Sequence, residues 1–205
     1  MRGVLITTRA ALVVGGLVAW LASAAQAGTP SSVEETVQQV CNNCHGRQGE
    51  SAGPAFPHLA GQNAAYITKQ LRDFKSGRRD NRAMREMMAE HSDAELVDLG
   101  VFYAAMKPVP HKMADAASAR AGRLLFNAGK PQSGVPACTA CHGVQGSGSN
   151  SLPRLAGQHA QYLKRQLQDF GQRQRTNDNA VMHDIASRLS EPEMDAVASY
   201  LSGLK

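Results

Sequence analysis

Apolar residues recur at intervals of three and four along two stretches of the chain. One stretch follows Asn63 and the other follows His159, and their apolar positions are Tyr66, Ile67, Leu71 and Phe74, and Tyr162, Leu163, Leu167 and Phe170. This spacing is close to the turn of an α-helix and unlike the two-residue repeat of a half-buried strand. Each stretch is therefore predicted to form one amphipathic helix.

Four further helices are predicted around these two. Ser92 and Ser190 are each followed three residues later by a glutamate, which is the capping-box signature of a helix start. Ser32–Val40 and Ala119–Ala128 also have helical patterns, and Gly122 in the second would let another helix approach closely. No run alternates convincingly between apolar and polar residues, so the predicted fold class is all-α.

The chain contains an internal duplication. Residues 57–74 return as residues 153–170 at an offset of 96, with 11 of 18 positions identical. An Asn-x-x-Met and a Ser-x-x-Glu pattern recur at an offset of 98, the matched residues being Asn81 and Asn179, Met84 and Met182, Ser92 and Ser190, and Glu95 and Glu193. Self-similarity over this length indicates two copies of one structural unit.

The ends of these units are predicted from composition. Arg2 and Arg9 precede and flank an apolar run over residues 10–22, and Ala25-Gln-Ala27 is typical of a signal-peptidase site. The segment 107–112 contains two prolines and is predicted to link the copies. We therefore expect a cleaved signal peptide over 1–27, an N-terminal domain over 28–109 and a C-terminal domain over 110–205. An uncleaved membrane anchor is the alternative for the first segment.

Charge argues against one class of partner. The chain has 22 basic and 17 acidic residues, and removing Arg2 and Arg9 with the signal peptide leaves 20 against 17. An exported, nearly neutral chain is not expected to bind nucleic acid.

The four cysteines carry the most specific signal. All of them lie in two C-x-x-C-H motifs, whose residues are Cys41, Cys44 and His45, and Cys138, Cys141 and His142. C-x-x-C-H is the attachment motif for c-type haem, in which two sulfurs form thioethers and the histidine binds the iron. The sequence predicts two covalently bound haem c groups. Zinc binding, a thioredoxin-like redox pair and structural disulfides are the alternatives.

The second axial ligand of each iron is predicted from the repeat. Met182 is the sole methionine in its stretch and lies eight residues before Ser190, while Met84 lies eight residues before Ser92. The separations from the motif histidines also agree, at 39 and 40 residues. Met84 and Met182 are therefore the predicted ligands. Met87 or Met88 in place of Met84 remains an alternative, as does a second histidine.

The other five histidines do not recur at equivalent positions of the repeat. They are His58, His91, His111, His159 and His183. Surface or capping roles are therefore predicted for them.

Two further features have both a functional and a plain structural interpretation. A backbone carbonyl at Pro57 and Pro153 could accept a hydrogen bond from the motif histidine, or these residues could simply form turns. Seven basic residues lead past Met84, and they form either a solvated face or a docking surface for an acidic partner or anionic lipid. They are Lys69, Arg72, Lys75, Arg78, Arg79, Arg82 and Arg85.

The tandem C-x-x-C-H motifs, each followed by P-x-L-A-G-Q and a Tyr…Gln-Leu…Asp-Phe helix, resemble the cytochrome c4 family over essentially the whole exported chain. The resemblance implies two tandem class I cytochrome c domains with His/Met ligation, and a non-enzymatic electron carrier in the periplasm, often at the inner-membrane surface. It further implies transfer from respiratory donors such as a quinol-oxidising complex to a terminal oxidase. A dihaem electron-transfer subunit of a periplasmic dehydrogenase complex is the alternative.

Overall fold

A computed structural model describes Gly3, residues 33–108 and residues 113–205. The expected signal peptide, its cleavage site, His111 and the expected domain boundary at 109–110 lie outside these residues. In the first repeat the helices are α1 (Val33–Thr36), a π-helical turn (Val37–Cys41), α2 (Asn42–His45), α3 (Ala64–Lys75), α4 (Arg82–Met88) and α5 (Asp93–Ala104). In the second they are α6 (Ala116–Ala128), a 3₁₀ turn (Pro131–Ser133), α7 (Thr139–His142), α8 (Ala160–Gly171), α9 (Val181–Ala186) and α10 (Glu191–Ser202).

The all-α prediction is confirmed. Among the described residues, β-structure is limited to a single isolated bridge between Lys130 and Val135. None of the helices within this part of the chain is both long and apolar enough to cross a membrane.

The predicted helix starts are also confirmed. Asn63 and His159 stand at the N-cap positions of α3 and α8. Ser92 forms a complete capping box with Glu95 at the start of α5, and the Ser190 N–H donates to Glu193 at the start of α10. These local signals act within one turn of helix, so they are readable without knowledge of the tertiary structure.

Helix α6 crosses α10 at Gly122, as the sequence predicted. A Cβ atom at position 122 would lie 1.9 Å from the Ala196 carbonyl oxygen, so only glycine allows this approach. Phe126, one turn later, is fully buried. The helix begins three residues before the expected Ala119, because the Asp115 side chain accepts hydrogen bonds from the first exposed N–H groups.

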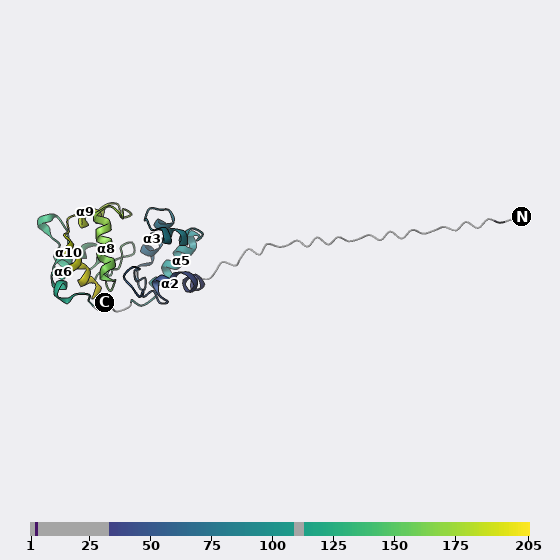
Figure 1. Ribbon diagram of the computed structural model, residues 1–205, viewed down its shortest axis with the longest axis horizontal. Helices are drawn as coiled ribbons and strands as arrows, with labels where there is room; N and C mark the ends of the chain where they lie inside the picture. The colour runs from purple at the N-terminus through teal and green to yellow at the C-terminus, as the bar shows by residue number, and fades with distance from the viewer. Residues whose placement is uncertain (1–2, 4–32, 109–112) are drawn as a thin grey trace. The chain divides into compact units, whose positions relative to one another are not determined.

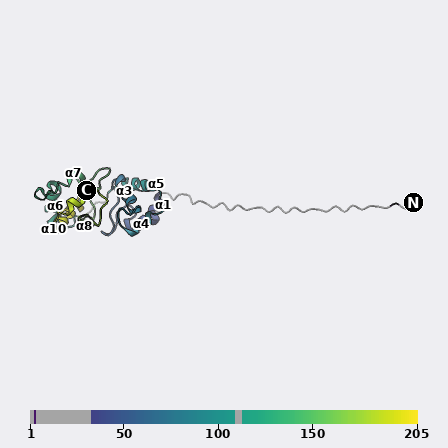
Figure 2. The ribbon, with the colours of Figure 1, turned by 90° about the horizontal axis from the view of Figure 1, so that it is seen from above.

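Each repeat has its own apolar core. The first is formed by Val37, Ile67, Leu71, Met88, Leu96, Leu99 and Tyr103. The second is formed by Leu125, Phe126, Leu163, Val197, Ala198 and Leu201. The ribbon shows the helices of each repeat grouped together (Figures 1 and 2). Contacts nevertheless join the repeats, since Ser31–Lys205 forms one compact unit.

Candidate haem-binding sites

The motif histidines are held in the same way in both repeats. The Nδ1–H of His45 donates to the Pro57 carbonyl at 3.0 Å, and that of His142 donates to the Pro153 carbonyl at 3.2 Å. A carbonyl can only accept, so Nδ1 carries the proton and Nε2 keeps the lone pair that a metal needs. Of the two interpretations of these prolines, the geometry supports the hydrogen-bonding one.

Burial keeps both imidazoles neutral. Desolvation lowers the pKa of His45 and of His142, and the hydrogen bonds to the proline carbonyls oppose this only in part. A neutral imidazole with Nδ1 bonded and Nε2 available is the form that binds iron.

The cysteines are unpaired thiols. All four are free, so the disulfide alternative finds no support in this structure. Burial raises the pKa of Cys41 and of Cys138, which keeps these two as neutral thiols. Within the described ranges no group of three or more His, Cys, Asp and Glu side chains could hold a metal ion, as a zinc site would require. Two free thiols on the helix that carries a neutral histidine fit the chemistry of haem attachment in both repeats.

The methionines differ sharply in burial. Met88 is 2% exposed in the first core, and Ala186, its equivalent in the repeat, is 0% exposed. Met84 and Met182 are both half-buried, whereas Met87 is 39% exposed. The matching environments support the alignment in which Met88 packs in the core and Met84 corresponds to Met182.

Both candidate ligands are fixed at the start of a short helix. The Met84 N–H donates to the Asn81 side chain at 3.0 Å, and the Met182 N–H donates to the Asp178 side chain at 2.5 Å. Asn179, which the sequence paired with Asn81, has a positive φ of 57° and does not take the capping role. The offset between the repeats changes from 96 to 98 residues just before these two methionines, and the different caps reflect this change.

The basic stretch is mostly neutralised by acidic neighbours. Five of its cations form ion pairs, the pairs being Lys69 and Arg78 with Asp73, Arg72 with Asp93, Arg82 with Glu86, and Arg85 with Asp80. Lys75 donates to the His91 carbonyl. Pairing on this scale favours the solvated-face interpretation over an electrostatic docking surface.

Arg79 belongs instead to a network between the repeats. Its guanidinium donates to the Tyr162 hydroxyl at 3.0 Å and to Gln166 at 2.8 Å. The equivalent Arg175 donates to the Tyr66 hydroxyl at 3.0 Å and to Gln70 at 2.9 Å. Sequence reasoning missed this network, although a 96-residue offset relates every pair of its members.

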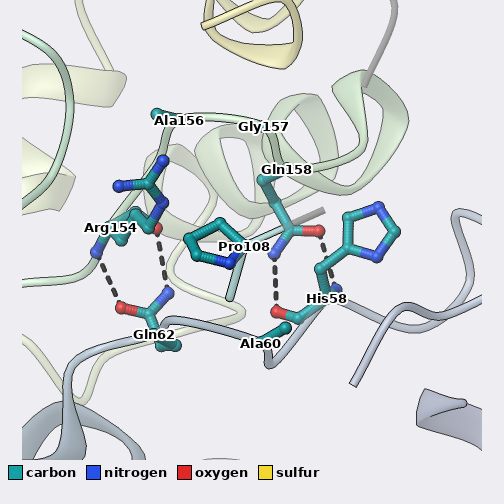
Figure 3. Close-up of a pocket in the computed structure, with 8 residues that line it drawn as sticks. All are labelled: His58, Ala60, Gln62, Pro108, Arg154, Ala156, Gly157 and Gln158. Atoms are coloured by element: carbon teal, nitrogen blue, oxygen red, sulfur yellow. Dashed lines mark hydrogen bonds between the residues drawn. The ribbon is translucent and has the colours of Figure 1, made fainter. Parts of the chain in front are cut away.

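A second set of hydrogen bonds joins the two P-x-L-A-G-Q segments. Gln62 bonds both backbone groups of Arg154, and Gln158 bonds both backbone groups of His58 (Figure 3). The imidazole of His58 stacks on that of His159, with ring centroids 3.9 Å apart. His58 is buried here, so the prediction of a surface or capping role was wrong for this residue. His159 stands at the N-cap position of α8, but its side chain makes no capping hydrogen bond and contacts the Ser51 hydroxyl instead.

Helical repeats that each combine C-x-x-C-H, a histidine held by a proline carbonyl and a half-buried methionine at an equivalent position define a tandem c-type cytochrome. The family model for cytochrome c matches residues 119–205, and the model for cbb3-type cytochrome c oxidase subunit III matches residues 28–102.

Individual relatives indicate which family of c-type cytochromes the chain resembles. Cytochrome c4 of Thiocapsa roseopersicina is 45% identical over 89% of this chain and 96% of its own. The crystal structure of reduced recombinant cytochrome c4 from Pseudomonas stutzeri matches with a TM-score of 0.81 and 38% identity, covering 87% of this chain and all of that one. A thiosulfate dehydrogenase electron acceptor of Stutzerimonas stutzeri is 41% identical over 80% of this chain and 79% of its own.

The chain belongs to the cytochrome c4 family of electron carriers and carries two haem c groups. The predictions of family, fold and cofactor are therefore confirmed.

Proposed function

We propose that each repeat binds one haem through the residues identified in the sequence. Cys41 and Cys44, and Cys138 and Cys141, would form the thioethers. His45 and Met84 would bind the first iron, and His142 and Met182 the second. The paired burial of Met84 and Met182, together with the matched histidine hydrogen bonds, supports this assignment.

Bound haem supplies a one-electron Fe(III)/Fe(II) couple, and the chain supplies its surroundings. His45 and His142 would bind the iron through Nε2, while the proline carbonyls fix the ring orientation. Met84 and Met182 would supply the thioether ligands, which favour the ferrous state. Two sites closed in this way would leave no open position for a substrate, as expected of a carrier with no substrate chemistry of its own.

The carrier is proposed to work in the periplasm after export by a cleaved signal peptide, in part at the inner-membrane surface. Electrons would pass from a respiratory donor, such as a quinol-oxidising complex, to a terminal oxidase. The alternative is a dihaem electron-transfer subunit of a periplasmic dehydrogenase complex, and the relative named as a thiosulfate dehydrogenase electron acceptor supports it.

Visible absorption of the purified protein tests the closed sites. Two haems per chain, a methionine–iron band in the oxidised form and no response of the reduced form to carbon monoxide are expected. A carbon monoxide response from either haem would contradict the closed-site carrier.

Partner kinetics separate the two roles. Rapid oxidation of the reduced protein by a purified terminal oxidase supports the respiratory role. Rapid reduction by thiosulfate dehydrogenase in the presence of thiosulfate, with no oxidase activity, would support the alternative.

A further inference from the structure

The two glutamines of the P-x-L-A-G-Q segments make a reciprocal exchange between the repeats. Gln158 accepts a hydrogen bond from the His58 N–H at 2.9 Å and donates one to the His58 carbonyl at 3.0 Å. Gln62 accepts from the Arg154 N–H at 2.7 Å and donates to the Arg154 carbonyl at 2.9 Å. Both glutamine side chains are buried, and Figure 3 shows the two exchanges side by side.

The peptide groups that the glutamines bind are the ones that hold the histidines. The His58 N–H and the Pro57 carbonyl belong to one peptide group, so Gln158 bonds one end of it and His45 bonds the other. In the second repeat the Pro153–Arg154 peptide is bonded in the same way by Gln62 and His142. Each histidine is thus one peptide group away from a glutamine of the other repeat.

Such a chain of hydrogen bonds is cooperative. An acceptor at the N–H end of a peptide polarises the amide and makes its carbonyl a stronger acceptor. A stronger carbonyl acceptor draws the Nδ1 proton and makes Nε2 a more basic ligand. A more basic ligand stabilises the ferric state, so the glutamine would lower the reduction potential of the haem.

We propose that Gln158 and Gln62 are positioning residues that act across the interface. Gln158 tunes the haem bound through His45, and Gln62 tunes the haem bound through His142. Each repeat thereby sets part of the potential of its neighbour. The inference rests on the proposed axial roles of His45 and His142.

The plain structural alternative is that the glutamines only hold the repeats together. Asn63 provides a matched control, because its side chain donates to the Ser147 and Leu152 carbonyls of the other repeat at 3.2 and 2.7 Å. Neither carbonyl belongs to a peptide group that bonds a motif histidine. Asn63→Ala therefore removes interface hydrogen bonds without interrupting either chain of hydrogen bonds.

The test compares Gln158→Leu, Gln62→Leu and Asn63→Ala in the mature dihaem protein. The potential of each haem is measured separately by redox titration followed by NMR, together with the chemical shift of the histidine Nδ1–H in the reduced state. Gln158→Leu should favour reduction of the N-terminal haem by about twofold or more, with a smaller effect on the C-terminal haem. Gln62→Leu should show the opposite selectivity, and Asn63→Ala should change neither haem.

Three results would overturn the inference. They are a larger shift in the haem of the mutated repeat, equal shifts in both haems, or a shift reproduced by Asn63→Ala. If the leucine variants do not mature, Gln158→Glu keeps an acceptor oxygen and should lower the potential of the N-terminal haem more than that of the C-terminal haem. The reverse order would also overturn it.

Failure of the proposed ligation is distinguishable from failure of this inference. The first would appear in the unmutated protein as a missing methionine–iron band or a carbon monoxide response. The second would leave that spectrum intact and would appear only in the selectivity of the variants.

Discussion

Arg175 donates a hydrogen bond to the Tyr66 hydroxyl at 3.0 Å, although 109 positions separate them in the chain. The equivalent pair, Arg79 and Tyr162, has the same length. Each guanidinium also lies over a phenylalanine of its own repeat, at 4.6 Å for Arg79 on Phe74 and 4.5 Å for Arg175. Equivalent arginine and tyrosine residues of the two repeats therefore form both hydrogen bonds, so the duplicated unit contains the residues for its own pairing.

This network separates Arg79 from the basic residues around it. Arg79→Glu would place a carboxylate against the Tyr162 hydroxyl and the Gln166 amide oxygen in a partly buried site, so the free energy of unfolding should fall by about 2 kcal/mol. Arg82 is 88% exposed and pairs only with Glu86 on its own helix, so Arg82→Glu should have little effect. Urea unfolding of the mature protein followed by circular dichroism measures both. Equal losses would contradict a role of Arg79 in the contacts between the repeats.

The two methionines near the first haem site should respond differently to truncation. Met84→Ala removes the proposed iron ligand, so the reduced protein should bind carbon monoxide at one haem. Met88→Ala leaves a cavity in the core and should lower the free energy of unfolding by about 2–5 kcal/mol without opening the iron. Carbon monoxide difference spectra and denaturant titration distinguish the effects. Carbon monoxide binding by Met88→Ala alone would show that the register of the repeat is wrong.

The carboxyl group of Glu193 should contribute a measurable dependence of stability on pH. The hydrogen bond from Lys130, together with those from Ser190, lowers the pKa of Glu193 from 4.5 to about 2. Because the folded form holds the proton less tightly than the unfolded form, the stabilisation is complete above pH 4.5 and is lost as the pH falls through 2. Glu193→Gln should flatten the curve of unfolding free energy against pH in this window. An unchanged curve would rule out this carboxyl as its source.

Gly122 should tolerate no side chain. Gly122→Ala places Cβ against the backbone of α10, which cannot yield as a flexible side chain would, so we expect a loss of at least about 2 kcal/mol. Leu124→Ala on the same helix is the control, since that side chain is 67% exposed. Thermal unfolding of both variants tests the close approach of α6 and α10. Wild-type stability of Gly122→Ala would contradict it.

Local signals in the sequence were sufficient for the helices and for the candidate haem sites. The capping box of Ser92 and Glu95 acts within one turn, and C-x-x-C-H places its cysteines and histidine within five residues. Alignment of the repeats also indicated Met84 among three nearby methionines, because the equivalent stretch of the second repeat contains Met182 alone. The predicted start of α6 at Ala119 was wrong because the helical pattern alone does not include the cap at Asp115.

The contacts between the repeats could not be predicted from local patterns. Arg79 lies within a run of basic residues and His58 lies in a loop, and neither context indicates contacts with the other repeat. Their environments are set by residues about 80 to 100 positions away.

The sequence by itself determined the all-α class, the duplication, the cofactor and the candidate ligands. These features depend on helix periodicity, capping and short-range chemistry, whose information lies within a few residues. Only the tertiary structure decided that Arg79 and Arg175 bridge the repeats, and that Gln62 and Gln158 bond the peptides behind the histidines. Such contacts require two surfaces distant in the chain to meet, and their geometry is fixed only when both repeats are folded.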